Sequence, residues 1–176
     1  MRKFFNFFLI VFASIFIAGI YGVFHDQITY TISPEYYTLF KFEQFGINEW
    51  GISDERVKVS IIGFLATWWV GLILGIIYAF VSLFFDSKKV LKVTMQSVLL
   101  NIGVTVIFGV LGFIYGVLFL RVENLNWNIP EETTYVQDFI NVGSIHNFGY
   151  IGGLIGLIVG VCFQIKNLKN IIVITN

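Results

Sequence analysis

Four long stretches of this chain carry no charged residue, and this pattern predicts its architecture. The uncharged stretches are residues 4–24, 61–85, 93–120 and 139–165. A helix needs about 20 apolar residues to cross a hydrocarbon core of about 30 Å, and each stretch reaches this length. Backbone polar groups in lipid must close their hydrogen bonds internally, which favours helices. We therefore predict an all-α, polytopic membrane protein whose four transmembrane helices form a bundle.

The polar residues around these stretches set the expected boundaries. The chain is predicted to form one integral membrane domain, residues 1–176, with Ser144 as the N-cap of the last helix and His146 in its first turn. We predict spans at about 4–24, 61–85, 95–120 and 145–165, outside loops at 25–60 and 121–144, and an inside loop at 86–94.

The first outside loop contains its own structural signals. Residues 25–32 end in alternating apolar and threonine positions, which is typical of an extended segment. Ser33 and Pro34 then predict the N-cap and first position of a short helix, rich in aromatic residues, that stops at Gly46. Such a helix suits either a position flat at the membrane interface, as a short interfacial helix, or a lid packed over the mouth of the bundle. In the second outside loop, Pro130 and the two acids that follow it predict another short helix.

The charged residues predict the orientation of the chain. If the N-terminus is cytoplasmic, the inside segments carry seven of the eleven basic residues and one acid, whereas the outside segments carry four basic residues and ten acids. Because basic residues concentrate in short cytoplasmic loops, both termini are expected to be cytoplasmic. No stripe of basic and aromatic residues indicates nucleic-acid binding, so the lipid bilayer is the expected partner.

Glycines recur at four-residue spacing in three of the predicted spans. Small residues at this spacing let helix backbones approach closely in lipid. The pattern indicates either packing within one four-helix bundle or a homo-oligomer, with a pore as one form of the latter. The glycines concerned are Gly71, Gly75, Gly112, Gly116, Gly152, Gly156 and Gly160.

A few polar side chains fall inside the predicted spans. Asn101 is expected to face other helices, because a strongly polar side chain in a membrane hydrogen-bonds across a helix interface. Trp68 and Trp69 lie near the middle of the second span. Their indole N–H groups need partners, so at least one of them is expected to face the bundle.

The two histidines of the chain fall at the same predicted membrane surface. His25 ends the first span and His146 begins the fourth, with Asp26 and Asn147 as their neighbours. Two histidines and one carboxylate form a known ligand set for zinc or iron, and such a site can activate water. Alternatively, these histidines transfer protons or simply hydrogen-bond loop carbonyls. No fixed-spacing metal signature is present, so no cofactor is identified beyond a possible divalent metal.

The outside segment His25-Asp26-Gln27-Ile28-Thr29-Tyr30-Thr31-Ile32-Ser33-Pro34-Glu35-Tyr36-Tyr37 carries a family resemblance. It resembles uncharacterised small bacterial four-span membrane proteins with an HDQxTYxISPEY-like outside segment. Further matches are residues 63–71 and His146-Asn147-Phe148 before the glycine-rich last span. The resemblance implies a shared architecture, and it brings no known activity. For the chain as a whole we expect a bacterial inner-membrane location.

Three functions remain open from the sequence. The first is a non-enzymatic binding or scaffold protein, whose acidic and aromatic outside cap holds a membrane-protein partner or lipid. The second is a metal-binding protein or metal-dependent hydrolase that uses His25, Asp26 and His146. The third is an oligomeric channel or transporter subunit, although no span has a charged residue at its centre, where coupled transport usually needs one.

Overall fold

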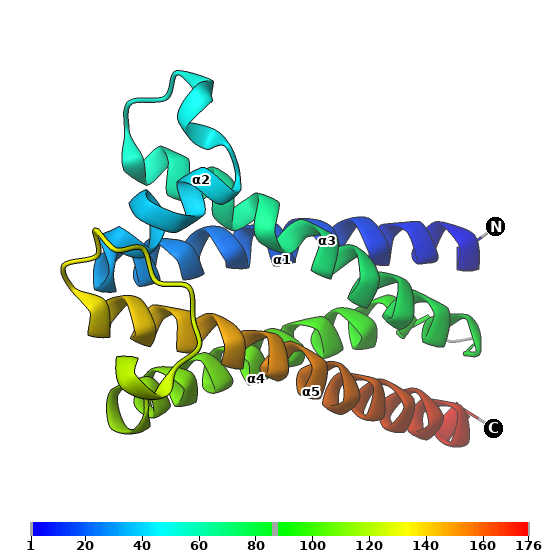
Figure 1. The fold of residues 1–176 in the computed structure, drawn as a ribbon. Coiled ribbons are helices and arrows are strands. Elements are labelled where there is room, and N and C mark those ends of the chain that lie inside the picture. The colour runs from blue at the N-terminus through cyan, green and yellow to red at the C-terminus, as the bar shows by residue number, and fades with distance from the viewer. Residues whose placement is uncertain (1, 86–87, 176) are drawn as a thin grey trace.

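The computed structural model describes residues 2–85 and 88–175, and in these residues it is entirely helical, without strands (Figure 1). Four of its helices are long and apolar enough to cross a membrane, as the charge pattern predicts. The all-α class is therefore confirmed, and the chain has the architecture of a multi-pass membrane protein. The long helices are α1 (Arg2–Ile32), α3 (Glu55–Leu83), α4 (Val90–Phe119) and α5 (Val136–Thr175).

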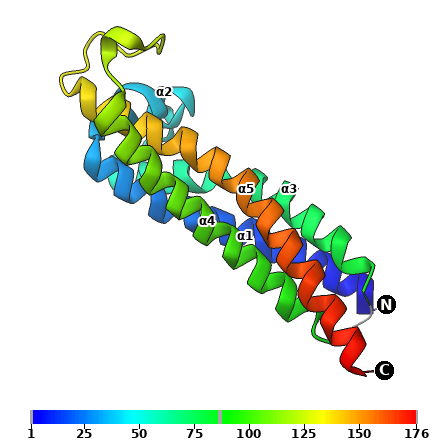
Figure 2. The same ribbon diagram turned by 90° about the horizontal axis from the view of Figure 1, so that it is seen from below.

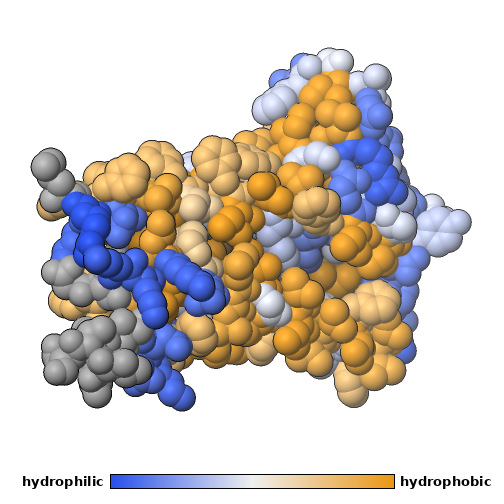
Figure 3. Space-filling model, turned by 180° about the vertical axis from the view of Figure 1, so that it is seen from behind, coloured by the Kyte–Doolittle hydropathy of each residue, from blue (hydrophilic) through white to orange (hydrophobic). Residues whose placement is uncertain are grey.

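The bundle consists of two antiparallel hairpins. Helix α1 packs along α3, and α4 packs along α5, whereas the contacts between the two pairs are sparser. Figures 1 and 2 show the four helices along one common direction, with both termini at one end. We call the opposite end, where the two long loops lie, the cap end. Hydrophobic side chains cover the middle of the molecule and hydrophilic ones gather at both ends (Figure 3), as expected for a protein that spans a bilayer.

Glycines set the distance between the helices of each hairpin. Gly22 of α1 and Gly63 of α3 lie backbone to backbone, and a Cβ atom on either would collide with the other. Thr67 of α3 also joins the two helices at this point, because its Oγ1 donates to the carbonyl of Ala18 of α1 at 2.9 Å. This close approach replaces the hydrophobic driving force that helices lack in lipid.

All seven glycines of the four-residue pattern pack against helices of the same chain. Gly71 and Gly75 face Ser14 of α1. The α4 glycines Gly112 and Gly116 face α5, and Gly152, Gly156 and Gly160 of α5 face α4, with Tyr78 of α3 also against Gly160. These contacts are those expected from packing within one bundle.

The first loop forms a cap, which we define as residues 33–54. It contains a π-helical turn (Tyr36–Lys41), α2 (Phe42–Gln44) and a 3₁₀ turn (Ile47–Trp50), and Gly46, at φ 62°, ends the helical part as predicted. Tyr37, Phe42 and Ile47 are buried against α3 and α5. The short helix is therefore a lid on the bundle; its position relative to a membrane surface remains a prediction.

The extended conformation predicted for residues 25–32 was wrong, because α1 continues to Ile32. Contacts with α3 hold this last part of the helix in place. Arg56 donates to the carbonyl of Gln27 and to Oγ1 of Thr31, at 3.0 and 3.1 Å, and Gln27 donates to the carbonyl of Arg56 at 2.8 Å. Asp54 is the N-cap of α3, since its side chain accepts from the N–H groups of Arg56 and Val57.

The second loop also differs from its prediction. Helix α5 begins at Val136, so Ser144 is no N-cap and His146 lies about three turns inside the helix. Ser144 instead donates across the hairpin to the carbonyl of Gly112 at 2.7 Å. No short helix follows Pro130, where a single turn closes through the Thr133 N–H and the Pro130 carbonyl at 3.1 Å.

Glu35 of the cap ties the two hairpins together at the start of α5. Its carboxylate accepts from the backbone N–H groups of Thr134 and Tyr135, at 3.1 and 2.8 Å. These are unpaired donors at a helix N-terminus, where a negative charge is favourable. The bond to Tyr135 is the largest cause that lowers the pKa of Glu35 below its ordinary value of 4.5.

We expect this tie to be pH-dependent. Because the folded-state pKa is lowered, the stability that Glu35 contributes is present above pH 4.5 and is lost as the pH falls through the folded-state value. Glu35→Gln should therefore lower the unfolding temperature at neutral pH, and the difference from the wild type should shrink below pH 4.5. Thermal unfolding of both proteins across the acidic range measures this, and a constant difference would contradict it.

Candidate functional site

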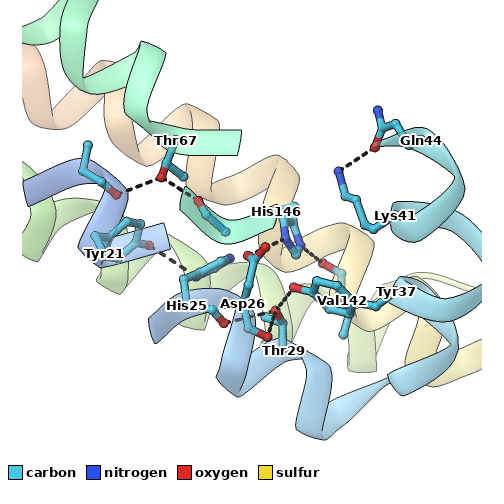
Figure 4. A network of polar contacts seen from close by, with 12 residues as sticks. Tyr21, His25, Asp26, Thr29, Tyr37, Lys41, Gln44, Thr67, Val142 and His146 are labelled. Atoms are coloured by element: carbon cyan, nitrogen blue, oxygen red, sulfur yellow. Dashed lines mark hydrogen bonds and ion pairs between the residues drawn. The ribbon is translucent and has the colours of Figure 1, made fainter. Parts of the chain in front are cut away.

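His25, Asp26 and His146 converge at the cap end of the bundle and point toward one another (Figure 4). Each offers a ligand atom, and the three atoms lie within 4.8 Å of one another. His25 and Asp26 come from α1 of one hairpin, and His146 comes from α5 of the other. The described residues thus contain a group that could hold a metal ion.

The His146 ring is held in one orientation. Its Nδ1 lies 2.9 Å from the carbonyl of Val142, one turn earlier, and since a carbonyl only accepts, Nδ1 carries a proton. Nε2 then points at Asp26, with 3.5 Å between Nε2 and Oδ1. Tyr36 of the cap stacks on the ring at 5.1 Å between centroids. A histidine that donates one ring N–H to a carbonyl and presents the other nitrogen has the orientation of a metal ligand.

His25 is oriented from its own helix. Its Nδ1 lies 3.4 Å from the hydroxyl of Tyr21, one turn earlier on α1. The rings of His25 and His146 meet edge to face, with centroids 4.9 Å apart. Nε2 of His25 is therefore the nitrogen left for a ligand in the cluster.

Asp26 is buried, with 3% of its surface exposed. Tyr37 of the cap lies beside it, and burial followed by the negative charge of Asp26 raises the pKa of the Tyr37 hydroxyl far above its ordinary value. That hydroxyl is 2.6 Å from Oγ1 of Thr29, which in turn bonds the carbonyls of His25 and Asp26. Tyr37 thus remains a protonated donor and anchors the cap on the last turns of α1.

Lys41 extends from the π-helical turn of the cap toward the same region. Its Nζ lies 5.2 to 5.8 Å from the ring centroids of Phe40, Tyr36 and Phe45, and it donates to Oε1 of Gln44 at 3.0 Å. Burial lowers the pKa of Lys41, and the Asp26 carboxylate opposes that shift. No carboxylate in the described part of the chain lies within ion-pair distance of this amino group.

A cavity of about 310 Å³ separates the two hairpins, and all four long helices line it. His25, Asp26, Lys41 and His146 lie at its cap end. Its other walls are mainly apolar, including Ile17, Val70, Leu74, Val98, Ile102 and Leu154.

The far end of the cavity is polar. Asn101 and Tyr78 border it, and the amide of Asn101 lies 3.2 Å from the Tyr78 hydroxyl. Gln164, which is fully buried, donates to the carbonyl of Tyr78 at 3.1 Å and to Oγ1 of Thr94 at 2.8 Å. Asn101 therefore faces other helices, as polar residues in a membrane do.

The remaining candidates lie apart from the histidine cluster. Trp69 borders the cavity although 44% of its surface is exposed, whereas Trp68 lies on the outer surface. Asn147 is exposed on α5, and no contact joins it to His25 or Asp26 among the interactions of the described residues.

Comparisons with protein family models, curated proteins and solved structures give no further identification. None of them matches this chain. The resemblance of the segment around His25 to a bacterial family therefore stays an expectation.

Sequence reasoning missed Tyr21, Tyr36, Tyr37 and Lys41 as neighbours of the histidines. Tyr21 carries a signal, since it precedes His25 by four residues on one helix face. The three cap residues depend on the π-helical turn, whose wider spacing brings Tyr36 and Lys41, five residues apart, to the same side. Nothing in the local sequence specified that turn.

Proposed function

We propose that this protein binds a divalent transition metal ion through His25, Asp26 and His146 at the cap end of its intramembrane cavity. The observation that carries the proposal is the convergence of three ligand atoms within 4.8 Å, from both hairpins, around a buried carboxylate. Buried charges in proteins are normally paired or bound to metals.

The pairing of Asp26 with His146 supports a cation between them. Nδ1 of His146 carries its proton toward Val142, so in the neutral ring Nε2 has a lone pair. That lone pair faces a carboxylate oxygen at 3.5 Å, and two acceptors repel each other. A proton between Nε2 and the carboxylate oxygen, or a metal ion, resolves the conflict. The nearby ring of His25 can supply a further ligand atom to a metal ion.

The ligand set indicates which metals fit and what they can do. Two histidines with one carboxylate suit zinc and non-haem iron. Three protein ligands leave a coordination position open, which distinguishes sites that bind or activate a further ligand from closed structural sites. All three residues line the cavity, so a further ligand of a metal held by them would lie in the cavity.

The other two functions have weaker support. The aromatic residues of the cap that a scaffold would present, Tyr36, Tyr37 and Phe42, are buried inside the protein. The glycines that a channel oligomer would use are in contact within the chain. We also propose a bacterial inner-membrane location with both termini in the cytoplasm, supported by the excess of basic residues at the end that holds the termini.

Bound metal is measured on protein purified without chelators or affinity metal. We expect near one equivalent of zinc or iron per chain by mass spectrometry. After dialysis against chelator, adding back the metal should raise the unfolding temperature, because a ligand at about 100 times its Kd stabilises the folded state by about 2.7 kcal/mol. Absence of metal, together with no shift on addition of zinc, iron or manganese, would refute the proposal.

A further inference from the structure

We propose that the cavity binds a single-chain amphiphile, whose carboxylate headgroup ligates the metal and whose hydrocarbon chain fills the apolar part between the hairpins. This inference rests on the proposed metal site and names the ligand that its open position takes. The cavity joins both features in one space, because the three metal ligands and the apolar side chains line the same walls.

The size and lining of the cavity suit one hydrocarbon chain. Its volume of about 310 Å³ lies at the lower end of known ligand pockets. At about 30 Å³ for each water-sized group, it has room for about ten such groups. Between the metal ligands and Asn101 the walls are mainly apolar, so hydrocarbon is a better occupant than water.

The rim of the cavity faces the region where lipid chains would lie. Trp69, Ile73, Tyr150 and Leu154 all line the cavity and are all exposed on the outer surface of the bundle. Figure 3 shows a hollow in the hydrophobic belt, with more hydrophilic side chains inside it. A ligand with a hydrocarbon chain can therefore enter sideways from the bilayer without crossing the cap.

The charges at the cap end favour an anionic headgroup. A divalent ion bound to the Asp26 carboxylate retains one positive charge, and Lys41 at the same end of the cavity adds another. Lys41 has no ion-pair partner in the parts of the chain that the structure describes. A carboxylate supplies both a metal ligand and a negative charge opposite the metal ion and Lys41, whereas an alcohol carries no charge.

The test uses the full chain in lipid nanodiscs and a photoreactive decanoate that carries a diazirine near its methyl end. We expect saturable labelling of residues around Val98 and Ile102, at the apolar part of the cavity. Unlabelled decanoate should compete at concentrations at least tenfold lower than decanol. Asp26→Asn should remove the metal and abolish this preference for the acid.

A cavity-filling variant provides the control for the chain. Gly153 lines the cavity and Gly103 does not. A Cβ on Gly153 would make only an ordinary van der Waals contact with Oγ1 of Thr105 at 4.0 Å, and a Cβ on Gly103 would meet nothing within 4 Å. Gly153→Leu should lower labelling at least tenfold and keep the metal, whereas Gly103→Leu should label like the wild type. Ala66→Leu, on the α3 wall, is a second filling variant if Gly153→Leu folds poorly.

The outcomes separate the two proposals. Metal without saturable labelling, labelling that both filling variants leave unchanged, or equal competition by decanol would each overturn the amphiphile and leave the metal site standing. Absence of metal from the wild-type sample, read by mass spectrometry on the same preparation, would overturn both.

Discussion

Replacing Asp26 by asparagine should remove the bound metal almost completely. Asparagine keeps the size of the side chain but loses the charge that offsets a divalent ion in this buried position. Mutation of a residue that only hydrogen-bonds a metal ligand lowers metal affinity by about 10 to 100-fold. Loss of the Asp26 carboxylate, which would itself bind the metal, should therefore lower the affinity by at least about 100-fold. Metal content and metal titration of the purified variant measure the effect.

The histidines provide a parallel series, and an exposed acid provides the matched control. His25→Ala and His146→Ala should each lose the metal, because each contributes one atom of the three-residue group. Glu132→Gln removes an exposed acid from the second loop at the same end of the molecule and should retain the full metal content. If Asp26→Asn kept its metal, the ion would have to lie elsewhere.

Gly63→Ala should strongly destabilise the first hairpin. Its new methyl group would meet the backbone of Gly22, which cannot move without separating α1 from α3. Overpacking of this kind costs about 1–3 kcal/mol. Unfolding of the protein in mixed micelles of increasing denaturing-detergent fraction measures the loss.

Gly103→Ala is the control for that experiment. Gly103 also lies inside a long helix, but a Cβ there meets nothing within 4 Å. Its substitution should change the free energy of unfolding by no more than about 1 kcal/mol, in the stabilising direction that helix propensity gives. Equal effects of the two substitutions would mean that backbone contact at Gly63 does not hold the hairpin together.

Much of the fold could be predicted because the bilayer imposes a length on uncharged helices. For this reason the uncharged stretch 4–24 lies within α1, and the stretch 61–85 lies within α3 except for its last two residues, which follow Leu83. The ends of the helices depended on contacts between distant segments. Arg56 of α3 supports the last turns of α1, and Glu35 of the cap binds the N–H groups before α5.

The candidate site was predictable in its chemistry and only partly in its geometry. His25 and His146 were expected at one membrane surface, and the structure places their rings 4.9 Å apart. Asn147 was included as the neighbour of His146, but adjacent residues on a helix point about 100° apart, so it faces outward. The role of Lys41 required the π-helical turn and could not be inferred from spacing.

The order of the helices along the chain bears on how the protein is made. Helices α1 and α3 leave the ribosome before α4 and α5, and their shared glycine crossing needs nothing from the second half. The first hairpin can thus assemble in the membrane while synthesis continues. His146 is synthesised after His25 and Asp26. The candidate metal-binding group is therefore complete only in chains whose second hairpin has been inserted and has joined the first.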